Sequence, residues 1–202
     1  MSLWLAEKPV VLASKSAIRR TILENAAIPV EAQPADIDER AIEQRSGGGT
    51  PGEVAALLAR EKARAVASGL PGRIVLGADQ TLALGDRRFS KPADRDAARD
   101  QLRALRGQVH ELHSAVALVR DGAVMFEHRD VARLTMRAFS DNFLDSYIEV
   151  AGSAVGTSVG GYQIEKSGIQ LFERIDGDHF TILGLPLLPL LEYLRRTGYV
   201  AG

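Results

Sequence analysis

The chain has 202 residues, enough for one large domain or a single two-lobed unit with a sizeable core. Its 25 lysines and arginines nearly balance its 26 aspartates and glutamates, and a net charge of −1 excludes a global field that would hold nucleic acid or an anionic membrane. The absence of cysteine excludes disulfides, thiolate metal sites and cysteine nucleophiles. With no visible signal peptide and no long apolar run, we expect a cytoplasmic protein without a membrane partner.

The apolar periodicity predicts strands interleaved with helices, plus one hairpin, and therefore an α/β fold with a mixed sheet. Strands are expected over residues 10–13, 74–78, 109–119, 124–135 and 169–175, and helices over 17–26, 51–68, 94–105, 140–150 and 186–196. Asp121-Gly122 predicts a tight hairpin turn between the two long strands. The glycine-rich stretch 45–52 is interpreted as a mobile loop, so residues 1–202 are expected to form one domain.

The first expected strand is followed by small hydroxyl and basic residues, in the sequence VVLASKSAIRR. A strand that ends at Ser14, Lys15 and Ser16 and continues as a helix presents free backbone N–H groups and hydroxyls, and Arg19 adds a fork of donors that suits phosphate. This pattern predicts a local anion site. The plainer alternative is a helix capped by Ser16 with solvated arginines.

The helix expected over residues 51–68 places charged residues on an otherwise apolar face. At 100° per residue its apolar stripe is formed by Val54, Leu57, Leu58 and Ala65. Glu61 falls inside this stripe and Lys62 at its edge. A buried carboxylate needs a cation, so Glu61 is either a metal ligand or the partner of an arginine. Lys62 either binds phosphate or extends into solvent.

Asp79 and Gln80 directly follow the expected strand 74–78, at the end of a strand where α/β proteins bind ligands. An aspartate here can hold Mg²⁺ or orient a water, and the alternative is a turn residue.

Lys91 precedes a proline and is a candidate second cation. The four histidines lack metal-ligand spacing and are interpreted as structural or surface residues. Glu39 belongs to an acidic loop that is either solvated or contributes a metal ligand.

Seven ordered blocks resemble the Maf-like nucleoside triphosphate pyrophosphatases. They are LASKSAIRR, LAREKA, LGADQT, SKP, RGQVHELHSAV, VGGYQIEKSG and IDGDHFTILGLPLLPLLEYL, and they span nearly the whole chain. The resemblance implies an elongated two-lobed α/β unit around a twisted mixed sheet, with the active site in the cleft. It also implies hydrolysis of a nucleoside triphosphate to the monophosphate and pyrophosphate with Mg²⁺ or Mn²⁺. By analogy with the family, a homodimer is possible, but the sequence itself does not determine the oligomeric state.

The resemblance assigns roles residue by residue. Ser16 and Arg19 match phosphate contacts, Lys62 and Lys91 the two lysines, Asp79 the catalytic aspartate and Glu39 the acidic loop position. Together with the residue-level hypotheses, the expected site residues are Asp79 for catalysis, Ser14, Lys15, Ser16, Arg19, Lys62, Gln80, Lys91 and Glu165 for substrate, and Asp79, Glu39 and Glu61 for metal.

The residues that leave the family pattern concern the base of the nucleotide. Gln80, Glu165 and the run LFERI look more like the branch acting on 7-methyl-GTP than the branch acting on dTTP and UTP. The expected role is the removal of non-standard nucleotides. A nucleotide-sensing regulator of cell division, which would bind a triphosphate without turning it over, is the alternative. A nucleic-acid partner is not expected, because no basic stripe is visible.

Overall fold

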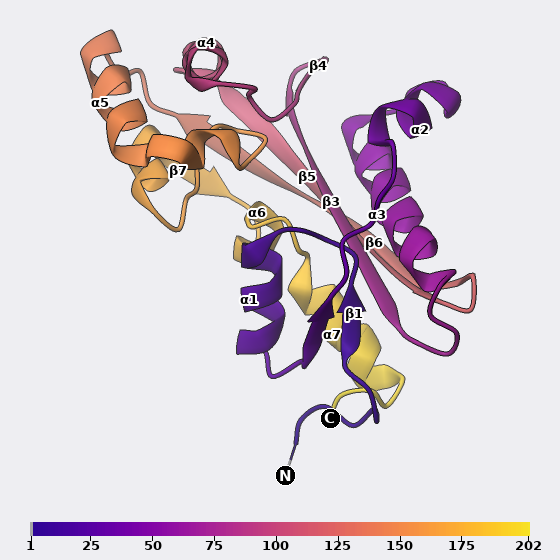
Figure 1. Ribbon diagram of the computed structural model, residues 1–202. Coiled ribbons are helices and arrows are strands. Elements are labelled where there is room, and N and C mark those ends of the chain that lie inside the picture. Colours follow the sequence, from indigo (N-terminus) through magenta and orange to yellow (C-terminus); the bar gives the residue numbers. More distant parts are fainter. Residues whose placement is uncertain (1) are drawn as a thin grey trace. The chain divides into compact units, whose positions relative to one another are not determined.

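The structure is a computed structural model that describes residues 2–202, and it has the mixed α/β fold expected from the sequence (Figure 1). Its seven-stranded sheet has the order β2-β1-β3-β5-β6-β7, with β4 paired to β3. The strands are β1 (Val10–Leu12), β2 (Val30–Ala32), β3 (Val75–Leu84), β4 (Arg87–Phe89), β5 (Val109–Arg120), β6 (Ala123–Met136) and β7 (Phe172–Asp176). The helices are α1 (Ala17–Asn25), α2 (Glu39–Arg45), α3 (Pro51–Ala67), α4 (Arg95–Leu105), α5 (Asp141–Ala151), α6 (His179–Ile182) and α7 (Leu187–Arg196), with short 3₁₀ helices η1 (Gly152–Gly156) and η2 (Ser167–Leu171).

The chain folds into two compact units. The first contains residues 1–80, 114–130 and 178–202, and the second contains residues 81–113 and 131–177. The strands β3, β5 and β6 each contribute residues to both units. The expectation of a single domain therefore stays a prediction, and each unit is described below by itself.

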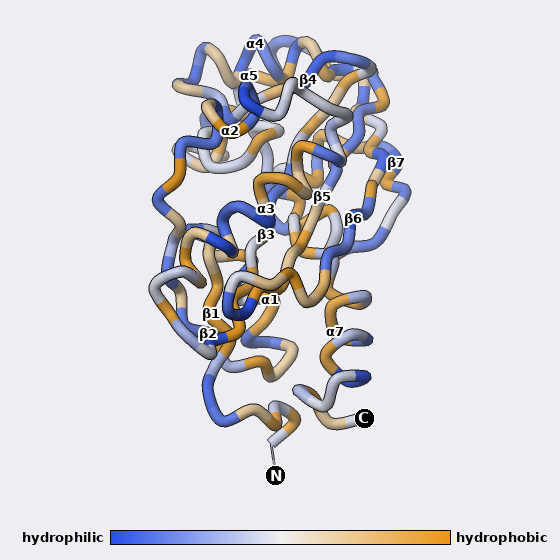
Figure 2. Tube along the Cα trace, turned by 90° about the vertical axis from the view of Figure 1, so that its right-hand side faces the viewer, coloured by the Kyte–Doolittle hydropathy of each residue, from blue (hydrophilic) through white to orange (hydrophobic). Residues whose placement is uncertain are grey.

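In the first unit, the parallel pairs β1–β2 and β1–β3 form a sheet with one helical layer on each face. Val10 and Leu12 pack with Leu76 against α1 and α7, whereas Val11 packs with Val75 against α3. This alternation explains why α1 and α3 lie on opposite sides of β1 in Figure 1. The trace of α7 alternates between apolar and polar colours in Figure 2, as expected for a helix with a single buried face.

The predicted buried face of α3 is right at Val54 and Leu58 and wrong at Ala65 and Glu61. Alanines dominate it, with Ala55, Ala59 and Ala63 completely buried, while Ala65 is exposed and Glu61 is half-buried. The reason is the close approach of β3, where a Cβ on Gly77 would lie 1.9 Å from the Ala59 carbonyl oxygen. Only small side chains fit such a contact, so alanines occupy the part of the buried face that lies over β3, beside the buried Val54 and Leu58.

The strand predicted at residues 74–78 is also longer than expected. β3 begins at Val75 and continues to Leu84, because its second half pairs antiparallel with β4, from Leu82↔Phe89 to Leu84↔Arg87. Asp79 therefore lies within a strand and not directly after one. The interpretation of Asp79 as a turn residue is wrong.

Other expected features are confirmed. Asp121 and Gly122 form the hairpin turn between β5 and β6, both with positive φ (+51° and +77°) as a type I′ turn requires. In the second unit, α4 and α5 match the predicted helices to within one residue at each end, and the side chains of Asp94 and Ser140 cap them. α4 and α5 contact each other there, and β6 pairs antiparallel with β7.

Candidate active site

The turn between β1 and α1 is fixed by its own hydroxyl groups. β1 ends at Leu12, and the Ser16 side chain caps α1 by accepting a hydrogen bond from the backbone N–H of Arg19 at 3.4 Å. The Ser14 hydroxyl accepts from the backbone N–H of Ser16 at 3.2 Å. Ser16 is thus the N-cap that the plainer interpretation requires, and the same turn positions Arg19.

Arg19 is anchored by acceptors and not left in solvent. Its Nε donates to the Gly184 carbonyl at 2.8 Å, and Nη1 donates to the Ala78 carbonyl at 2.8 Å and to Ser14 Oγ at 3.3 Å. Among residues 2–202, Nη2 donates to no partner. A rigid, planar guanidinium held in this way keeps one nitrogen available to an external anion.

A second charged cluster lies where α3 crosses β3. Lys62 Nζ is 2.5 Å from Asp79 Oδ1 and 2.8 Å from Glu39 Oε1. The Lys62 and Asp79 side chains are only 13% and 10% exposed, whereas Glu39, at the start of α2, is 49% exposed. α3, β3 and the first residue of α2 therefore bring together three residues that the sequence predicts for the site, with Glu39 in a helix and not in the expected loop.

The surroundings of this cluster change its proton affinities. Burial raises the pKa of Asp79, and the positive charges of Lys62 and Arg19 offset part of that effect. Burial also lowers the pKa of Arg19, and the negative charges of Asp79 and Glu39 offset part of that decrease. Asp79 thus takes up a proton more readily than an exposed aspartate, which is a property of general bases.

Gln80 points to the opposite face of the sheet from Asp79, because neighbours in a strand alternate. Its amide Nε2 lies within hydrogen-bond distance of Ser114 Oγ (2.9 Å) and of the carbonyls of Thr181 (3.1 Å) and Ile182 (3.0 Å). These contacts fix the orientation of the amide. Gln80 therefore presents a defined acceptor oxygen, with its nitrogen already engaged.

Three of the predicted substrate residues are exposed. Lys15 follows β1 in the first unit and makes no hydrogen bond or ion pair with any described residue. Lys91 and Glu165 belong to the second unit and are exposed there. The roles of all three stay predictions.

The three carboxylates expected to bind metal are not gathered into one group. Glu61 pairs with Arg64 at 3.1 Å and with Arg60 at 4.0 Å, both on its own helix. Among residues 2–202, no three His, Asp or Glu side chains lie close enough to hold a metal ion. Glu61 therefore has the arginine partners of the alternative interpretation, while its role as a metal ligand stays a prediction. Asp79 and Glu39 are the two carboxylates that meet at Lys62.

Sequence reasoning missed the groups that hold Gln80 and Arg19, most of which come from the C-terminal segment. Ser114 Oγ donates to the Thr181 carbonyl at 2.7 Å, and Thr181 Oγ1 donates to Asp130 Oδ2 at 2.8 Å. Gly184 contributes only its carbonyl oxygen. Main-chain acceptors leave no residue-type signal, although the turn residues in IDGDHFTILGLP mark this segment as tightly folded.

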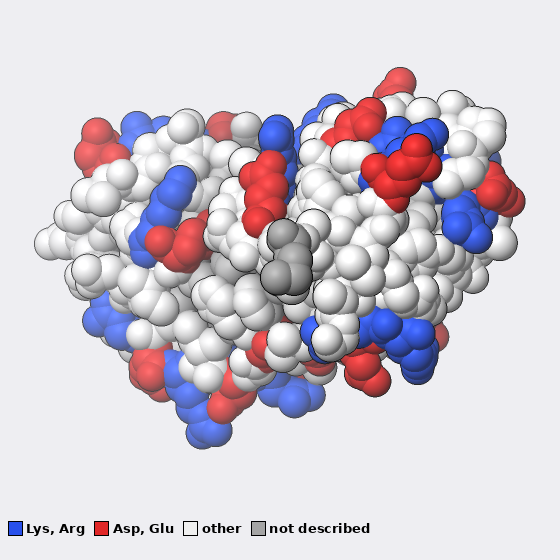
Figure 3. Space-filling view, turned by 90° about the horizontal axis from the view of Figure 1, so that it is seen from below, with Lys and Arg blue, Asp and Glu red and all other residues white. Residues whose placement is uncertain are grey.

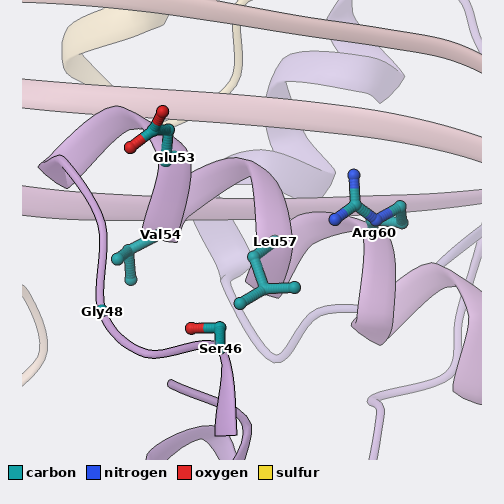
Figure 4. A pocket seen from close by; sticks show the side chains of 6 residues that line it. All are labelled: Ser46, Gly48, Glu53, Val54, Leu57 and Arg60. Carbon is teal, nitrogen blue, oxygen red and sulfur yellow. The ribbon is translucent and has the colours of Figure 1, made fainter. Parts of the chain in front are cut away.

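A separate pocket in the first unit is lined by charged side chains that are already paired with other residues. Its volume is about 340 Å³, and it is lined by Ser46, Gly48, Glu53, Val54, Leu57 and Arg60 (Figure 4). The Glu53 carboxylate is engaged in a capping box with Thr50, and Arg60 pairs with Glu127 at 3.1 Å. The pocket contains none of the predicted site residues.

Two of the four histidines, His110 and His113, have structural partners, as expected. His110 is buried, with Nε2 2.6 Å from the Tyr162 hydroxyl, and His113 Nε2 lies 2.9 Å from Glu111 Oε2.

The surface charges are mixed in sign: on the face drawn in Figure 3, basic and acidic side chains are interspersed over a largely uncharged surface. Within residues 2–202, no helix has the length and apolar character needed to cross a bilayer.

The arrangement pairs an anchored arginine with a buried carboxylate and a lysine. Arg19 bonds the Ala78 carbonyl, and Asp79 is the next residue of the same strand. Guanidinium and ammonium groups bind phosphate oxygens, and a carboxylate of raised pKa can take a proton from water. The first unit therefore holds the parts required for hydrolysis of a phosphate anhydride.

Comparisons with known proteins agree with this chemistry. A family model described as "Maf-like protein" matches residues 9–197. A nucleoside triphosphate pyrophosphatase of Rhodopseudomonas palustris (strain BisB18) is 58% identical over 201 residues, covering 100% of each chain. A 7-methyl-GTP pyrophosphatase of Mesorhizobium japonicum is 51% identical over 195 residues, covering 96% of this chain and 98% of that protein. Among solved structures, a HAM1 protein from Coxiella burnetii aligns at 19% identity with 65% of this chain and 74% of its own, at a TM-score of 0.43, a likeness too distant to bear on function.

Proposed function

Because the chain belongs to the Maf-like protein family, we propose that it hydrolyses a nucleoside triphosphate to a nucleoside monophosphate and pyrophosphate. The observation that supports this most strongly is the meeting of Asp79 and Lys62 beside the anchored guanidinium of Arg19. These residues come from three distant parts of the sequence, and each has the chemistry that the reaction needs.

In this proposal the cations bind the triphosphate and Asp79 handles the proton. Arg19 Nη2, the Lys62 ammonium and the exposed Lys15 receive phosphate oxygens, which neutralises charge that grows in the transition state. Water attacks the α-phosphorus, a carboxylate oxygen of Asp79 accepts its proton, and pyrophosphate leaves. Lys91 and Glu165 are further contacts that the sequence predicts.

The residues present fit a divalent cation of the magnesium type. Asp79 and Glu39 share one ammonium group, so their oxygens already converge on a positive charge, and Mg²⁺ commonly binds one or two carboxylates together with substrate phosphates. When bound, the cation would supply additional charge neutralisation at the phosphates. Lys62 and the cation then compete for the same two carboxylates.

We infer that 7-methyl-GTP is the first substrate to test, with dTTP and UTP as the alternative. The 7-methylguanine base carries a positive charge and presents N–H donors on one edge, features that a carboxylate such as that of Glu165 recognises. On this basis Glu165→Gln lowers kcat/KM for 7-methyl-GTP more than for UTP. The removal of non-standard nucleotides, a homodimer and a cytoplasmic location remain expectations from the family resemblance.

The test is an assay of purified protein with 7-methyl-GTP, dTTP, UTP and GTP, with products separated by chromatography. We expect monophosphate and pyrophosphate in equal amounts, and loss of both when EDTA is added. Retained activity in EDTA would contradict the metal requirement alone. Tight binding of a triphosphate without any turnover would instead favour the nucleotide-sensing regulator.

A further inference from the structure

We propose that Gly184 is a positioning residue, whose main-chain carbonyl and missing side chain together aim the Arg19 guanidinium at the phosphates. This inference rests on the proposed function, in which Arg19 binds the triphosphate. It adds a residue from near the C-terminal end of the chain to a motif near its beginning, since the two positions are 165 residues apart.

The hydrogen bonds of Arg19 define the orientation of the whole guanidinium plane. Nε donates to the Gly184 carbonyl and Nη1 to the Ala78 carbonyl, each at 2.8 Å. Because the group is planar and rigid, fixing two of its nitrogens fixes the third. Nη2, which has no acceptor among the described residues, then points in one direction only.

The space around Gly184 depends on the absence of a side chain. A Cβ there would lie 3.1 Å from Arg19 Nη2 and 3.4 Å from Nε, and 3.6 Å from Gln80 Cδ. The residue also has a φ of +87°, which disfavours any other amino acid. An added methyl group would therefore push against the very nitrogen that the proposed function uses.

The segment that carries Gly184 is held in place by its own bonds. The N–H of Gly184 donates to the Thr181 carbonyl at 3.0 Å, and the N–H of Leu185 donates to the Phe180 carbonyl at 2.9 Å. Asp178 caps this turn by accepting from two backbone N–H groups, both at 3.0 Å. The carbonyl of Gly184 is thus a fixed acceptor, and Arg19 adapts to it.

The decisive variant is Gly184→Ala, compared with Gly198→Ala. Gly198 has a similar φ of +75° but nothing within 4 Å of its added Cβ, so it reproduces the backbone strain without the contact to Arg19. Calorimetry measures binding of tripolyphosphate, and steady-state kinetics measures KM and kcat for the nucleotide. For Gly184→Ala we expect affinity to fall about tenfold and KM to rise by a similar factor, the effect of one misplaced charge-assisted hydrogen bond.

For Gly198→Ala we expect both quantities to stay within about twofold of wild type. In an Arg19→Lys background, Gly184→Ala should add little further loss, because the side chain it displaces is already altered. Equal effects of the two glycine variants, or fully additive effects of Gly184→Ala and Arg19→Lys, would overturn the inference. If the wild-type protein hydrolysed no nucleotide, the proposed function would fail, while the tripolyphosphate affinities would still decide the role of Gly184.

A measurement on the wild-type protein covers the case in which Gly184→Ala does not fold. Nitrogen-15 NMR of arginine side chains reports the exchange of each Nε–H with water. The Nε–H of Arg19 should exchange far more slowly than that of Arg40, which is exposed and bonds no described residue, and it should remain protected when tripolyphosphate binds. Equal exchange rates for the two arginines would contradict the anchoring on which the inference depends.

Discussion

A buried carboxylate is a costly group for a protein to keep, and Asp79 is such a group. It lies in β3 with its Oδ1 on the Lys62 ammonium, and burial raises its pKa despite that partner. A group whose pKa is raised by folding stabilises the folded state only below its unfolded pKa, and it loses that contribution as the pH rises through the folded pKa. At neutral pH, Asp79 therefore opposes folding, which is consistent with retention for chemistry.

The variant Asp79→Asn separates these two effects. We expect kcat to fall at least about a hundredfold, because the proton acceptor is lost. The free energy of unfolding should rise at neutral and alkaline pH, where the buried charge is removed, and the difference from wild type should shrink as the pH falls through the pKa of Asp79. Steady-state kinetics and urea unfolding at several pH values measure the two quantities.

Glu61→Gln provides the matched change of carboxylate to amide. Glu61 is half-buried on α3 and pairs with Arg60 and Arg64, so turnover should stay within about twofold of wild type. A strong loss of activity in Glu61→Gln would restore its predicted role in metal binding. An active Asp79→Asn protein would remove the carboxylate from the mechanism.

At the scale of elements, the site depends on how closely α3 approaches β3. Gly77 lies directly under the helix, where an added Cβ would be 1.9 Å from the Ala59 carbonyl oxygen and 2.9 Å from the Ala63 nitrogen. Lys62 is on the same helix and Asp79 on the same strand. The distance between the two elements therefore controls the ion pair as well as the core.

Gly77→Ala should be strongly destabilising, by at least about 3 kcal/mol, because the obstructing atoms belong to the backbone and cannot rotate away. Gly69→Ala is the control, since it too avoids positive φ and its Cβ would meet its nearest neighbour at an ordinary 3.9 Å. Thermal unfolding followed by circular dichroism measures both variants. Similar melting temperatures for the two would show that α3 moves away from the strand without cost.

The elements that the sequence predicts well are those with local signals. The Asp121-Gly122 turn and the helices α4 and α5 each follow from residue patterns within a short stretch of sequence. The second half of β3 was missed although it has a local signal, because Gly85-Asp86 forms a two-residue turn to β4 with Gly85 at a φ of +56°. In α3, the burial of Val54 and Leu58 follows from the apolar periodicity, whereas the buried alanines reflect the close approach of Gly77.

Site residues follow the same division. Ser16, Arg19, Lys62 and Asp79 have side-chain chemistry that is visible in the sequence, and the structure places them in the first unit. Gly184 acts through a carbonyl oxygen that every residue possesses, so only the fold reveals it. The metal set stays a prediction, with Asp79 and Glu39 meeting at Lys62 and Glu61 paired with arginines of its own helix.

At the scale of the whole molecule, a buried histidine makes stability depend on pH. His110 is fully buried in the second unit beside Tyr162 and Phe172, and burial lowers its pKa from 6.5 to about 4. As the pH falls below 6.5, the unfolded chain binds a proton that the folded chain excludes. The contribution of His110 to the free energy of unfolding is therefore fully present above pH 6.5 and declines as the pH falls toward 4.

Between neutral pH and about pH 4.5, His110 should account for a loss of about 2–3 kcal/mol in the free energy of unfolding. In His110→Phe this part of the pH dependence is absent, although the variant starts from lower stability because the Tyr162 hydroxyl loses its partner. Urea unfolding of both proteins at the two pH values measures the difference. Equal pH dependence in the two proteins would show that His110 is protonated in the folded state.

The position of water attack tests the central claim most directly. The reaction is run in oxygen-18-labelled water with 7-methyl-GTP or another accepted triphosphate, and the products are examined by mass spectrometry. We predict that one labelled oxygen enters the nucleoside monophosphate and none enters pyrophosphate, because water attacks the α-phosphorus. Label in pyrophosphate or in inorganic phosphate, or release of a nucleoside diphosphate, would contradict the account.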